Sequence, residues 1–532
     1  MATPRRLVII GGVAAGATAA ARARRLSEDV EILLIERGKY VSFANCGLPY
    51  FLSGDIKRRS ALLLQTPEGF FSRYRVEVRL ETEAVKLDRD ARRITLRKGG
   101  VDEQLSYDEL LLAQGGSPFV PPIAGSDAEH VFRLWTMIDL DRIHRFVNEK
   151  KPRSAVVVGG GFIGLETSEA LRARGLDVSL VELAPHPMPT ADAEFGGRIV
   201  GVLRDAGIQV HVGRKVVELA QREGAPVAIL DDGTVLPAEV VVLSAGVRPN
   251  TELAASAGLA LGPAGGVLVD ERMRTSDPHI FAAGDMIEFP HRISGKPARI
   301  PLAGPANRQG RIAATNALGG DMRYAGALGT SVLKVIDHTF AMTGLSLAAA
   351  KAAGLEARSV SIHKDHHAAY YPGASELSLS LIFEVPSGRL LGAQAIGREG
   401  VDKRIDVVAT ALAGKLSVHE LAEIDLAYAP PYGSANDPLH MAAYAAQNAL
   451  SGYSPAVGED SVLAILNGGA GTLLDVRTFG ERSRGFVSPS LHIPLDELRE
   501  RLEEVPANAP VVVLSKTGFE GHVAVRTLLG QG

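Results

Sequence analysis

The sequence contains one cysteine and one tryptophan among its 532 residues, and aromatic residues make up only 5%. A single cysteine excludes a disulfide within the chain, so a secreted scaffold held together by disulfides is not expected. It also excludes a reaction that alternates between a dithiol and a disulfide of one chain. Redox chemistry at Cys46 therefore requires a sulfenic acid, a persulfide or a mixed disulfide with another molecule.

Strong net charge and long apolar runs are also missing. The formal net charge is −4, and aromatic residues for base stacking are few, so no nucleic-acid partner is expected. No apolar stretch is long enough to span a bilayer, and the short run LVIIG near the N-terminus is interpreted as a strand rather than a secretion signal. We expect a cytoplasmic protein with no membrane partner, and several domains because of its length.

One pattern occurs twice: an apolar run rich in β-branched residues, a Gly-rich turn and a helix rich in Ala, Leu and Arg. The first copy begins at Leu7 and the second at Ala155, and each continues into a strand that ends at an acid, Glu36 or Glu182. This is the βαβ unit of a dinucleotide-binding domain. The chain is therefore predicted to be an α/β protein with two Rossmann-like domains.

The two Gly-rich turns are expected to bind pyrophosphate, because glycine lets backbone N–H groups approach phosphate oxygens. The second turn has the complete G-x-G-x-x-G spacing: Gly159, Gly161 and Gly164. In the first turn, Val13 takes the middle place between Gly11 and Gly16, and Gly12 partly compensates. For either copy alone, a tight turn between strand and helix is the alternative, and the repetition favours two cofactor sites.

The acids at the strand ends are expected to accept hydrogen bonds from ribose hydroxyls. Glu36 would hold the adenosine ribose of one cofactor, and Glu182 would hold that of the other. Because a carboxylate repels a 2′-phosphate, Glu182 favours NADH over NADPH. A solvated strand end is the alternative for each acid taken singly. Two dinucleotide sites in one chain suggest FAD together with NADH or NADPH.

Three further segments resemble motifs of the pyridine nucleotide–disulfide oxidoreductases: TSDPHIFAAGD (275–285), YDELLLAQGGSP (107–118) and PLAGPANRQGR (301–311). In the second segment Gln114 replaces a threonine of that family. The resemblance implies that Asp285 binds the ribityl chain of FAD. The cofactor contacts that we expect are Gly11, Gly12, Ala14, Gly16, Glu36, Arg37, Ala113, Gly115, Asp285, Leu302, Ala303, Gly159, Gly161, Ile163, Gly164, Glu182 and Gly246.

The cysteine lies in SFANCGLPY, which resembles the active-site segment of coenzyme A disulfide reductases and related NADH-dependent persulfide reductases. The resemblance implies that Cys46 attacks a disulfide, retains coenzyme A (CoA) as a mixed disulfide, and is released by reduced flavin. A small buried cysteine is the alternative, but the position after the first βαβ unit favours the nucleophile. We expect the thiolate to be stabilised by the N-terminus of a following helix and by oxidised flavin.

The segments HAAYYPGA and LAYAPPYGSANDP resemble motifs of the dimerisation domain of this family, which implies a homodimer. The resemblance assigns Tyr370 and Tyr428 the task of reaching the cysteine of the partner subunit, where a phenol can protonate a leaving thiolate. Tyr371 and Tyr432 are expected to be core or interface residues. The residues expected to bind CoA, as substrate or as bound thiol, are Arg22, Arg25, Ser42, Asn45, Asn307 and Arg308.

The C-terminal segments LLDVRT, HIPLDELR and VVVLSKTGFEGHVAVRTLL resemble a rhodanese domain. Ser515 stands where that domain has its persulfide-carrying cysteine, and Glu520 replaces its loop arginine. A serine hydroxyl does not take up sulfane sulfur as a thiolate does. The pattern stops at Gly532, before the closing strand and helix, so we expect an incomplete and inactive module that docks a sulfur-carrier protein or steadies the dimer.

These observations predict a chain of four domains. We expect an FAD-binding domain at 1–112 and 248–325, an NAD(P)H-binding domain at 113–247, an α+β dimerisation domain at 326–447, a linker at 448–460 and the rhodanese-like module at 461–532. The predicted function is NAD(P)H-driven reduction of CoA disulfide, CoA persulfide or a related persulfide or polysulfide, with no metal.

Two other functions stay open. The first is an NADH oxidase or peroxidase that cycles Cys46 through a sulfenic acid, although such relatives have a histidine where this chain has Ala14. The second is a non-catalytic sensor of CoA or of redox state.

Overall fold

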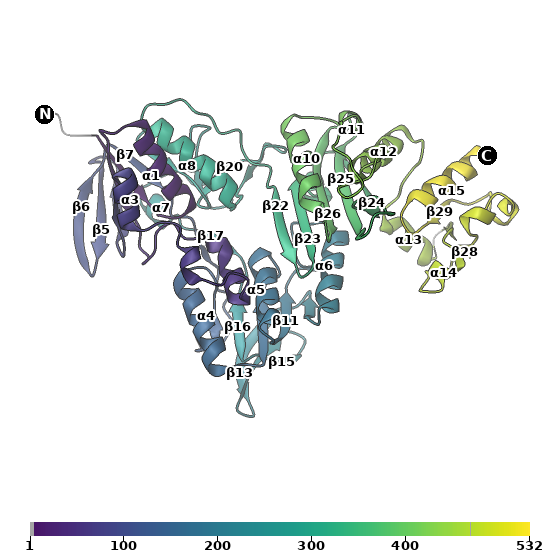
Figure 1. Cartoon of the computed structure of the whole chain (residues 1–532), viewed down its shortest axis with the longest axis horizontal. Helices are drawn as coiled ribbons and strands as arrows, with labels where there is room; N and C mark the ends of the chain where they lie inside the picture. The colour runs from purple at the N-terminus through teal and green to yellow at the C-terminus, as the bar shows by residue number, and fades with distance from the viewer. Residues whose placement is uncertain (1–4, 469, 532) are drawn as a thin grey trace. The chain divides into compact units, whose positions relative to one another are not determined.

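The computed structural model describes residues 5–468 and 470–531. The chain divides into two compact units, Met1–Ile336 and Asp337–Gly532. Figure 1 follows the elements of both in chain order. The predicted α/β class with two dinucleotide-binding domains is confirmed, because the first unit contains two separate parallel sheets of five strands.

The first sheet has the strand order β19-β7-β1-β2-β3, and all its neighbouring strands are parallel. Its strands are β1 (Arg6–Ile10), β2 (Glu31–Ile35), β3 (Glu77–Arg79), β7 (Glu109–Leu112) and β19 (Ile280–Ala282). The apolar side chains of β1 and β7 are buried because helices cover the sheet. Helix α1 (Ala14–Leu26) packs against α8 (Ala303–Ala317), as Figure 1 shows, and α3 (Pro67–Tyr74) lies close to β3.

The second sheet has the order β12-β11-β10-β16-β9. Its strands are β9 (Val131–Phe132), β10 (Ser154–Val158), β11 (Asp177–Glu182), β12 (Gln209–Val212) and β16 (Val240–Leu243). The helices of this domain are α4 (Met137–Lys150), α5 (Phe162–Ala173) and α6 (Ala193–Asp205). A short helix of the first domain, α2 (Leu48–Ser53), packs against α5. This contact brings the segment that follows Cys46 to the second domain.

Smaller elements complete the first unit. The antiparallel pair β8 (Gly116–Pro118) and β17 (Val247–Pro249) forms where the chain leaves and re-enters the first domain. The remaining elements are β4 (Glu83–Asp88), β5 (Arg93–Lys98), β6 (Val101–Ser106), β13 (Val216–Arg222), β14 (Ala225–Leu230), β15 (Val235–Pro237), α7 (Glu252–Ser256), β18 (Val267–Leu268), β20 (Ile287–Pro290), β21 (Pro297–Ala298) and β22 (Ser331–Val335).

The second unit begins with antiparallel strands in the order β23-β26-β25-β24. They are β23 (His338–Gly344), β24 (Ala357–Asp365), β25 (Glu376–Glu384) and β26 (Leu390–Gly397), and the helices are α9 (Leu347–Ala352), α10 (Val401–Ala413), α11 (Val418–Ala422) and α12 (Pro438–Ser451). A buried ion pair links α10 to the start of α12, with 2.7 Å between Arg404 Nη2 and Asp437 Oδ2. Because both charges are buried, each compensates the desolvation of the other.

A small α/β module follows. Its parallel sheet has the order β28-β27-β29, and its core contains Leu474, Val476, Ile493, Leu498 and Ala524. The elements are α13 (Glu459–Leu466), β27 (Thr472–Asp475), α14 (Phe479–Arg482), β28 (Leu491–His492), β29 (Val511–Leu514) and α15 (Phe519–Gly530).

The predicted linker at 448–460 overlaps two helices at its ends. The Ala-rich helix α12 continues to Ser451, and Gly452 with a φ of +71° caps it in the left-handed conformation. Helix α13 begins at Glu459, so the connection without a helix is 452–458. Across the described parts of the chain, none of the helices combines the length and the apolar character that crossing a membrane requires.

Candidate active site

The two Gly-rich turns have nearly the same geometry. Gly11 and Gly159 have φ values of +102° and +105°, and a Cβ on either would lie within about 2.4 Å of a carbonyl oxygen from the neighbouring strand segment. A Cβ on Gly16 would lie 1.8 Å from the oxygen of Gly11, and one on Gly164 would lie 1.8 Å from that of Gly159. Only glycine therefore permits each helix to start this close to its strand.

The acids at the strand ends also occupy equivalent positions. Glu36 accepts hydrogen bonds from the N–H of Gly12 at 2.9 Å and from that of Gly38 at 2.7 Å. Glu182 accepts from Gly160 at 2.6 Å and from Ala184 at 2.7 Å. These bonds fix each carboxylate beside its Gly-rich turn. Each oxygen keeps a second lone pair with which it can accept a ribose hydroxyl.

Residues next to the turns leave room for a ligand. A Cβ on Gly115, Gly161 or Gly246 would meet nothing within 4 Å, so open space lies over these three predicted cofactor contacts. Two buried polar atoms in the adjoining segments, Gln114 Oε1 and Ser244 Oγ, have no hydrogen-bond partner among the described residues. Open space beside unsatisfied polar atoms fits a dinucleotide with its many donors and acceptors.

The flavin motif around Asp285 lies next to the first Gly-rich helix. A Cβ on Gly284 would contact the Cβ atoms of Ala15 and Ala306, so this loop sits between α1 and α8. The N–H of Gly284 donates to Gln309 Oε1 at 2.9 Å. Burial raises the pKa of Asp285, and nearby Arg299 counteracts this rise.

The other predicted cofactor residues lie at the ends of the same elements. Ala14 begins α1, Leu302 caps α8 and Ala303 begins it, while Ala113 directly follows β7. Arg37 is exposed and donates to Ser117 Oγ at 3.4 Å, and Ile163 lies in the first turn of α5. Sequence analysis thus selected residues that the fold brings to the carboxyl ends of two parallel sheets, where ligands of this fold bind.

Cys46 is exposed and lies in a short 3₁₀ helix, Asn45–Gly47, between β2 and α2. The loop is tied to the first Gly-rich turn, because the N–H of Ser42 donates to the oxygen of Gly12 at 2.7 Å. Asn45 Oδ1 accepts from the N–H of Cys46 at 3.1 Å and lies 3.8 Å from its Sγ. The predicted nucleophile and the first dinucleotide turn therefore form one local structure.

The protein groups around Cys46 oppose its ionisation. Partial enclosure raises the pKa of the thiol most, and the negative charges of Glu166 and Asp285 raise it further, while a backbone hydrogen bond lowers it. The helix expected after the cysteine is present as α2, which begins at Leu48, and stabilisation of a thiolate by its N-terminus stays a prediction.

One pair near the cysteine was missed by sequence analysis. The hydroxyl of Tyr50 on α2 donates to Glu166 Oε1 on α5 at 3.1 Å. Burial raises the pKa of Glu166 to about 7, and burial together with Glu166 raises the pKa of Tyr50. Both residues stand inside recognised motifs, SFANCGLPY and GGGFIGLE, but their pairing depends on the packing of two domains.

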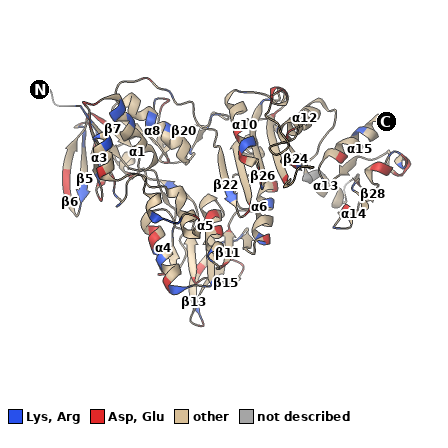
Figure 2. Ribbon diagram, viewed as in Figure 1, with Lys and Arg blue, Asp and Glu red and all other residues tan. Residues whose placement is uncertain are grey.

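The residues expected to bind CoA gather on α1, on α8 and around the cysteine. Arg22 Nε donates to Thr315 Oγ1 at 3.1 Å, and Thr18 Oγ1 donates to Asn307 Oδ1 at 2.8 Å, so both contacts span α1 and α8. Burial and the charges of Arg311 and Arg25 lower the pKa of Arg22. In Figure 2 the ribbon of this helix pair is blue at its Lys and Arg positions. Arg311, missed by sequence analysis, enlarges a cationic surface suited to phosphate groups.

In the second unit, the two predicted tyrosines meet. The hydroxyls of Tyr370 and Tyr428 lie 3.4 Å apart, although the residues are 58 positions apart in the sequence. Tyr370 is 76% exposed and Tyr428 is 50% exposed. Their hydrogen bond raises the pKa of Tyr370. Tyr371 and Tyr432 are exposed as well, so neither is a core residue of this chain.

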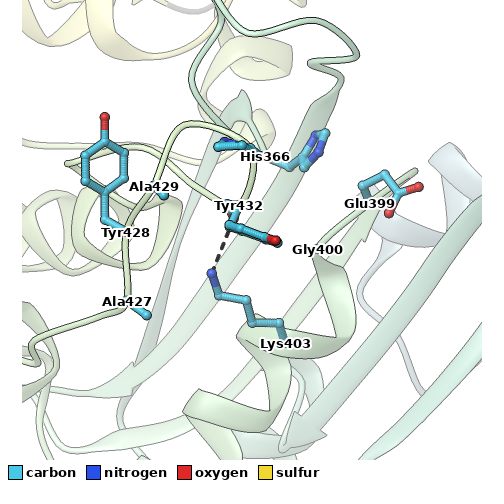
Figure 3. A pocket seen from close by; sticks show the side chains of 9 residues that line it. His366, Glu399, Gly400, Lys403, Ala427, Tyr428, Ala429 and Tyr432 are labelled. Carbon is cyan, nitrogen blue, oxygen red and sulfur yellow. Dashed lines mark hydrogen bonds between the residues drawn. The ribbon is translucent and has the colours of Figure 1, made fainter.

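Tyr428 also lines a pocket of about 490 Å³. Figure 3 shows the pocket with Tyr428, Tyr432, His366 and Lys403 around it. Lys403 Nζ donates to the carbonyl oxygen of Tyr432 at 3.4 Å, which ties α10 to the tyrosine-bearing loop. Within the described residues, no group of three or more His, Cys, Asp or Glu side chains is arranged to hold a metal ion.

The loop around Ser515, which we expected to correspond to a rhodanese cysteine loop, is closed by its own side chains. Ser515 Oγ accepts from the N–H of Gly518 at 3.0 Å, and Thr517 Oγ1 donates to Glu520 Oε2 at 2.7 Å. A Cβ on Gly521 would lie 2.9 Å from Ser515 Oγ. Glu520 lies in the first turn of α15, directly after this loop, where its carboxylate adds negative charge.

Models of two protein families match the chain. The model of the pyridine nucleotide-disulphide oxidoreductases matches residues 5–310, and that of their dimerisation domain matches residues 330–437. The chain belongs to the pyridine nucleotide-disulphide oxidoreductases. It is therefore a flavin-dependent enzyme that uses a pyridine nucleotide, as the two dinucleotide sites predicted.

Two curated relatives illustrate the range of this family. An NADH oxidase of Methanocaldococcus jannaschii is 34% identical over 451 residues, which cover 84% of this chain and 99% of the relative. A coenzyme A disulfide reductase of Staphylococcus haemolyticus is 32% identical over 447 residues, covering 84% of this chain and 100% of the relative. Both resemblances that sequence analysis weighed are therefore present among relatives.

Two solved structures of the family match almost the whole chain. Reduced CoADR-RHD of Bacillus anthracis has a TM-score of 0.95 and 43% identity, covering 99% of this chain and 95% of that one. A NAD-dependent persulfide reductase of A. fulgidus has a TM-score of 0.93 and 36% identity, covering 99% and 97%. The predicted resemblance to disulfide and persulfide reductases is confirmed, and these matches extend into the C-terminal module.

Proposed function

We propose that the enzyme reduces CoA disulfide, CoA persulfide or a related polysulfide through Cys46 alone. The observation that carries this proposal is the position of the chain's only thiol. Cys46 is exposed, and its loop is hydrogen-bonded to the first dinucleotide turn. With no second cysteine, the second sulfur of every disulfide step belongs to the substrate.

The first step is thiol–disulfide exchange. The thiolate of Cys46 attacks one sulfur of the substrate, the substrate S–S bond breaks, and a mixed disulfide forms while the other sulfur leaves and takes up a proton. With CoA disulfide the leaving group is CoA thiol. When bound, FAD reduced by the nicotinamide cofactor would supply the two electrons that cleave the S–S bond of the mixed disulfide. Cys46 returns to its thiolate, and the retained group leaves as a second thiol after it takes up a proton. Gly159, Gly161, Gly164 and Glu182 would hold that nicotinamide cofactor, with NADH favoured by the Glu182 carboxylate.

CoA is anionic, and basic residues gather on the helix pair α1–α8. Arg22, Arg25 and Arg311 surround the α1–α8 contact, and Ser42 and Asn45 flank the cysteine. Asn307 is held by Thr18, and Arg308 is exposed on the same helix α8. Guanidinium groups suit the phosphates of CoA, so we assign this surface to its nucleotide end.

The paired tyrosines supply a proton for the leaving thiolate. A phenol that is hydrogen-bonded to a second phenol is positioned to donate to an anion in front of both. We infer that Tyr370 and Tyr428 act on Cys46 of the partner subunit of a homodimer. The match to the dimerisation domain of the family supports this arrangement.

For the C-terminal module we propose a role without sulfur transfer. Ser515 offers no thiolate, and Glu520 would repel an anionic sulfur donor. A thiosulfate:cyanide assay is expected to show no turnover. Turnover that persists in Cys46→Ala would contradict this expectation. Docking of a sulfur-carrier protein is the retained role that we propose for the module.

An NADH oxidase is the second candidate, because one curated relative carries that name. Ala14 stands in the first Gly-rich turn, and it offers no polar group for peroxide chemistry. Steady-state NADH oxidation with CoA disulfide, CoA persulfide, polysulfide, hydrogen peroxide and oxygen separates the candidates. We expect the sulfur compounds to be turned over fastest. Faster turnover of oxygen or peroxide would favour the oxidase, and flavin bleaching without turnover of any substrate would favour a sensor.

A further inference from the structure

Two loops of the second unit carry the tyrosine pair. The first loop, 366–375, joins β24 to β25 and contains Tyr370, and the second loop, 423–437, joins α11 to α12 and contains Tyr428. Figure 3 shows His366, at the start of the first loop, and Tyr428 of the second from close by. Because the two hydroxyls lie 3.4 Å apart, their spacing depends on how the two loops are held against each other.

Arg404 connects the ends of these two loops. It lies near the start of α10, and its side chain is completely buried. Its Nη2 donates to the carbonyl oxygen of His366 at 2.7 Å and to Asp437 Oδ2 at 2.7 Å. One nitrogen atom therefore joins the first residue of one loop to the last residue of the other.

The other donors of Arg404 hold its guanidinium in one orientation. Its Nε donates to Asp437 Oδ1 at 2.9 Å, and its Nη1 donates to the carbonyl oxygen of Gly400 at 2.9 Å. Asp437 also caps α12, because it accepts from the N–H of Leu439 at 3.0 Å. Since the guanidinium is planar and its donors form a fixed fork, the bonds to Asp437 determine where the bond to His366 lies.

Closer to the tyrosines the two loops meet directly. The N–H of Ala368 donates to the carbonyl oxygen of Gly433 at 2.9 Å. This bond stands two residues before Tyr370 and five residues after Tyr428 along the chain. The hydrogen bonds of Arg404 to the loops are formed at the loop ends, and neither phenol takes part in them.

We propose that Arg404 is a positioning residue for the tyrosine pair. It fixes the two loops against each other, and the phenols of Tyr370 and Tyr428 therefore stay within hydrogen-bonding distance. This inference rests on the proposed role of the pair as proton donor to a leaving thiolate. A buried ion pair that served only stability would change the melting temperature and leave kcat unchanged in enzyme that remains folded.

The test uses the full chain with its flavin bound and the double variant Arg404→Met/Asp437→Asn. Both charges are removed together, so neither is left buried without its partner, and asparagine still caps α12. The bond to His366 is lost. We expect kcat for CoA disulfide to fall more than about tenfold with KM unchanged, because a misplacement of about 1 Å can cost about 10²-fold.

Arg389→Met/Glu384→Gln is the matched control. Arg389 and Glu384 also form two hydrogen bonds between a guanidinium and a carboxylate, at 3.1 Å and 3.0 Å. Glu384 ends β25, and the loop that carries Tyr370 precedes the start of this strand. The control therefore removes a similar ion pair of the same unit at a distance from the tyrosine loops. Its kcat is expected to equal that of the wild type.

A second comparison separates positioning from a general loss of structure. In the background Tyr370→Phe/Tyr428→Phe, the substitutions Arg404→Met/Asp437→Asn should lower kcat no further, because the groups that Arg404 positions are absent. An equal fall of kcat in both backgrounds would overturn the inference. Wild-type kcat in the folded variant Arg404→Met/Asp437→Asn would overturn it as well.

Flavin absorbance and melting temperature report whether each variant is folded. Arg404→Lys is the second variant, for use where the double substitution prevents folding. Lysine keeps a positive charge opposite Asp437 but lacks the fork of donors. We expect a smaller fall of kcat that again disappears in the background Tyr370→Phe/Tyr428→Phe, and a fall that persists there would contradict the inference.

Hydrogen exchange of the Ala368 amide tests the positioning without turnover. Because this N–H donates to Gly433 across the two loops, we expect it to exchange faster in Arg404→Met/Asp437→Asn and at the wild-type rate in the control. Unchanged exchange would overturn the inference. Failure of the proposed function would appear differently, as wild-type kcat in Tyr370→Phe/Tyr428→Phe.

Discussion

The hydroxyls of Tyr370 and Tyr428 are separated by 3.4 Å. At this distance one phenol can donate a hydrogen bond to the other. Both side chains are exposed, so neither contributes much to the core of its own unit. A pair of exposed phenols in contact is well suited to serve a reacting atom outside its own chain.

We expect Tyr370→Phe and Tyr428→Phe to lower kcat for CoA disulfide by about 10²-fold, because proton donation to the leaving thiolate is lost. The KM for CoA disulfide should change little, since we assign the nucleotide end of CoA to the surface of α1 and α8. Steady-state kinetics with each variant measure both constants. Tyr371→Phe is the matched control and should resemble the wild type. A rise in KM with kcat unchanged would assign the tyrosines to binding instead.

Glu182 is the second residue for which we predict the effect of a substitution. We expect Glu182→Ala to raise the KM for NADH about tenfold, since we assign the carboxylate to the ribose hydroxyls, and to reduce the discrimination against NADPH. Kinetics with both nucleotides measure this change. Glu36→Ala provides the contrast, because it should weaken flavin retention and leave the nucleotide preference unchanged. Equal discrimination in Glu182→Ala and in the wild type would contradict the assignment.

At the residue scale, sequence analysis found groups that carry a local motif and missed those defined by packing. Glu36 and Glu182 follow from the βαβ pattern, because the acid always lies at the same strand end. The pair of Tyr50 and Glu166 could not be predicted, since its two members are 116 positions apart and meet only when α2 packs on α5. The raised pKa of Cys46 depends on that same packing.

Helices and turns with strong local signals were predicted well. The two helices predicted after the Gly-rich turns are α1 (Ala14–Leu26) and α5 (Phe162–Ala173). The end of α12 was not predicted, because this helix continues to Ser451, inside the predicted linker, and ends at the left-handed Gly452. A terminal turn of a helix depends on capping and on tertiary contacts, which composition does not reveal.

Glycines of the Gly-rich turns have two different roles. Some permit a close backbone contact, and others leave open space beside the turn. We expect Gly164→Ala to lower the melting temperature of the enzyme, because its Cβ would lie 1.8 Å from the carbonyl oxygen of Gly159. Gly161→Ala should leave the melting temperature unchanged, since its Cβ meets nothing within 4 Å. It should instead raise the KM for NADH by filling space that we assign to the cofactor. Thermal melts and NADH kinetics measure the two effects, and equal loss of stability in both variants would contradict this distinction.

The whole molecule is expected to work as a homodimer with tyrosines acting between subunits. Cys46→Ser and Tyr428→Phe subunits are mixed in equal amounts after reversible dissociation. About half of the dimers should then be heterodimers, and each heterodimer has one complete site out of two. The mixture should therefore show about a quarter of the wild-type activity. Each variant alone should be nearly inactive. Activity that stays at the level of the separate variants, while native mass spectrometry detects heterodimers, would place the tyrosines and the cysteine of one site on the same subunit.

The most direct measurement of the central claim is the mass of the peptide that contains Cys46 after the oxidised enzyme has met CoA disulfide. NADH is omitted so that the flavin stays oxidised and the mixed disulfide formed by exchange is not reduced, and the reaction is then quenched in acid. The account predicts one CoA attached to Cys46 through a disulfide, and its disappearance when excess NADH is added. An unmodified Cys46 in an enzyme that still reduces CoA disulfide would contradict the account.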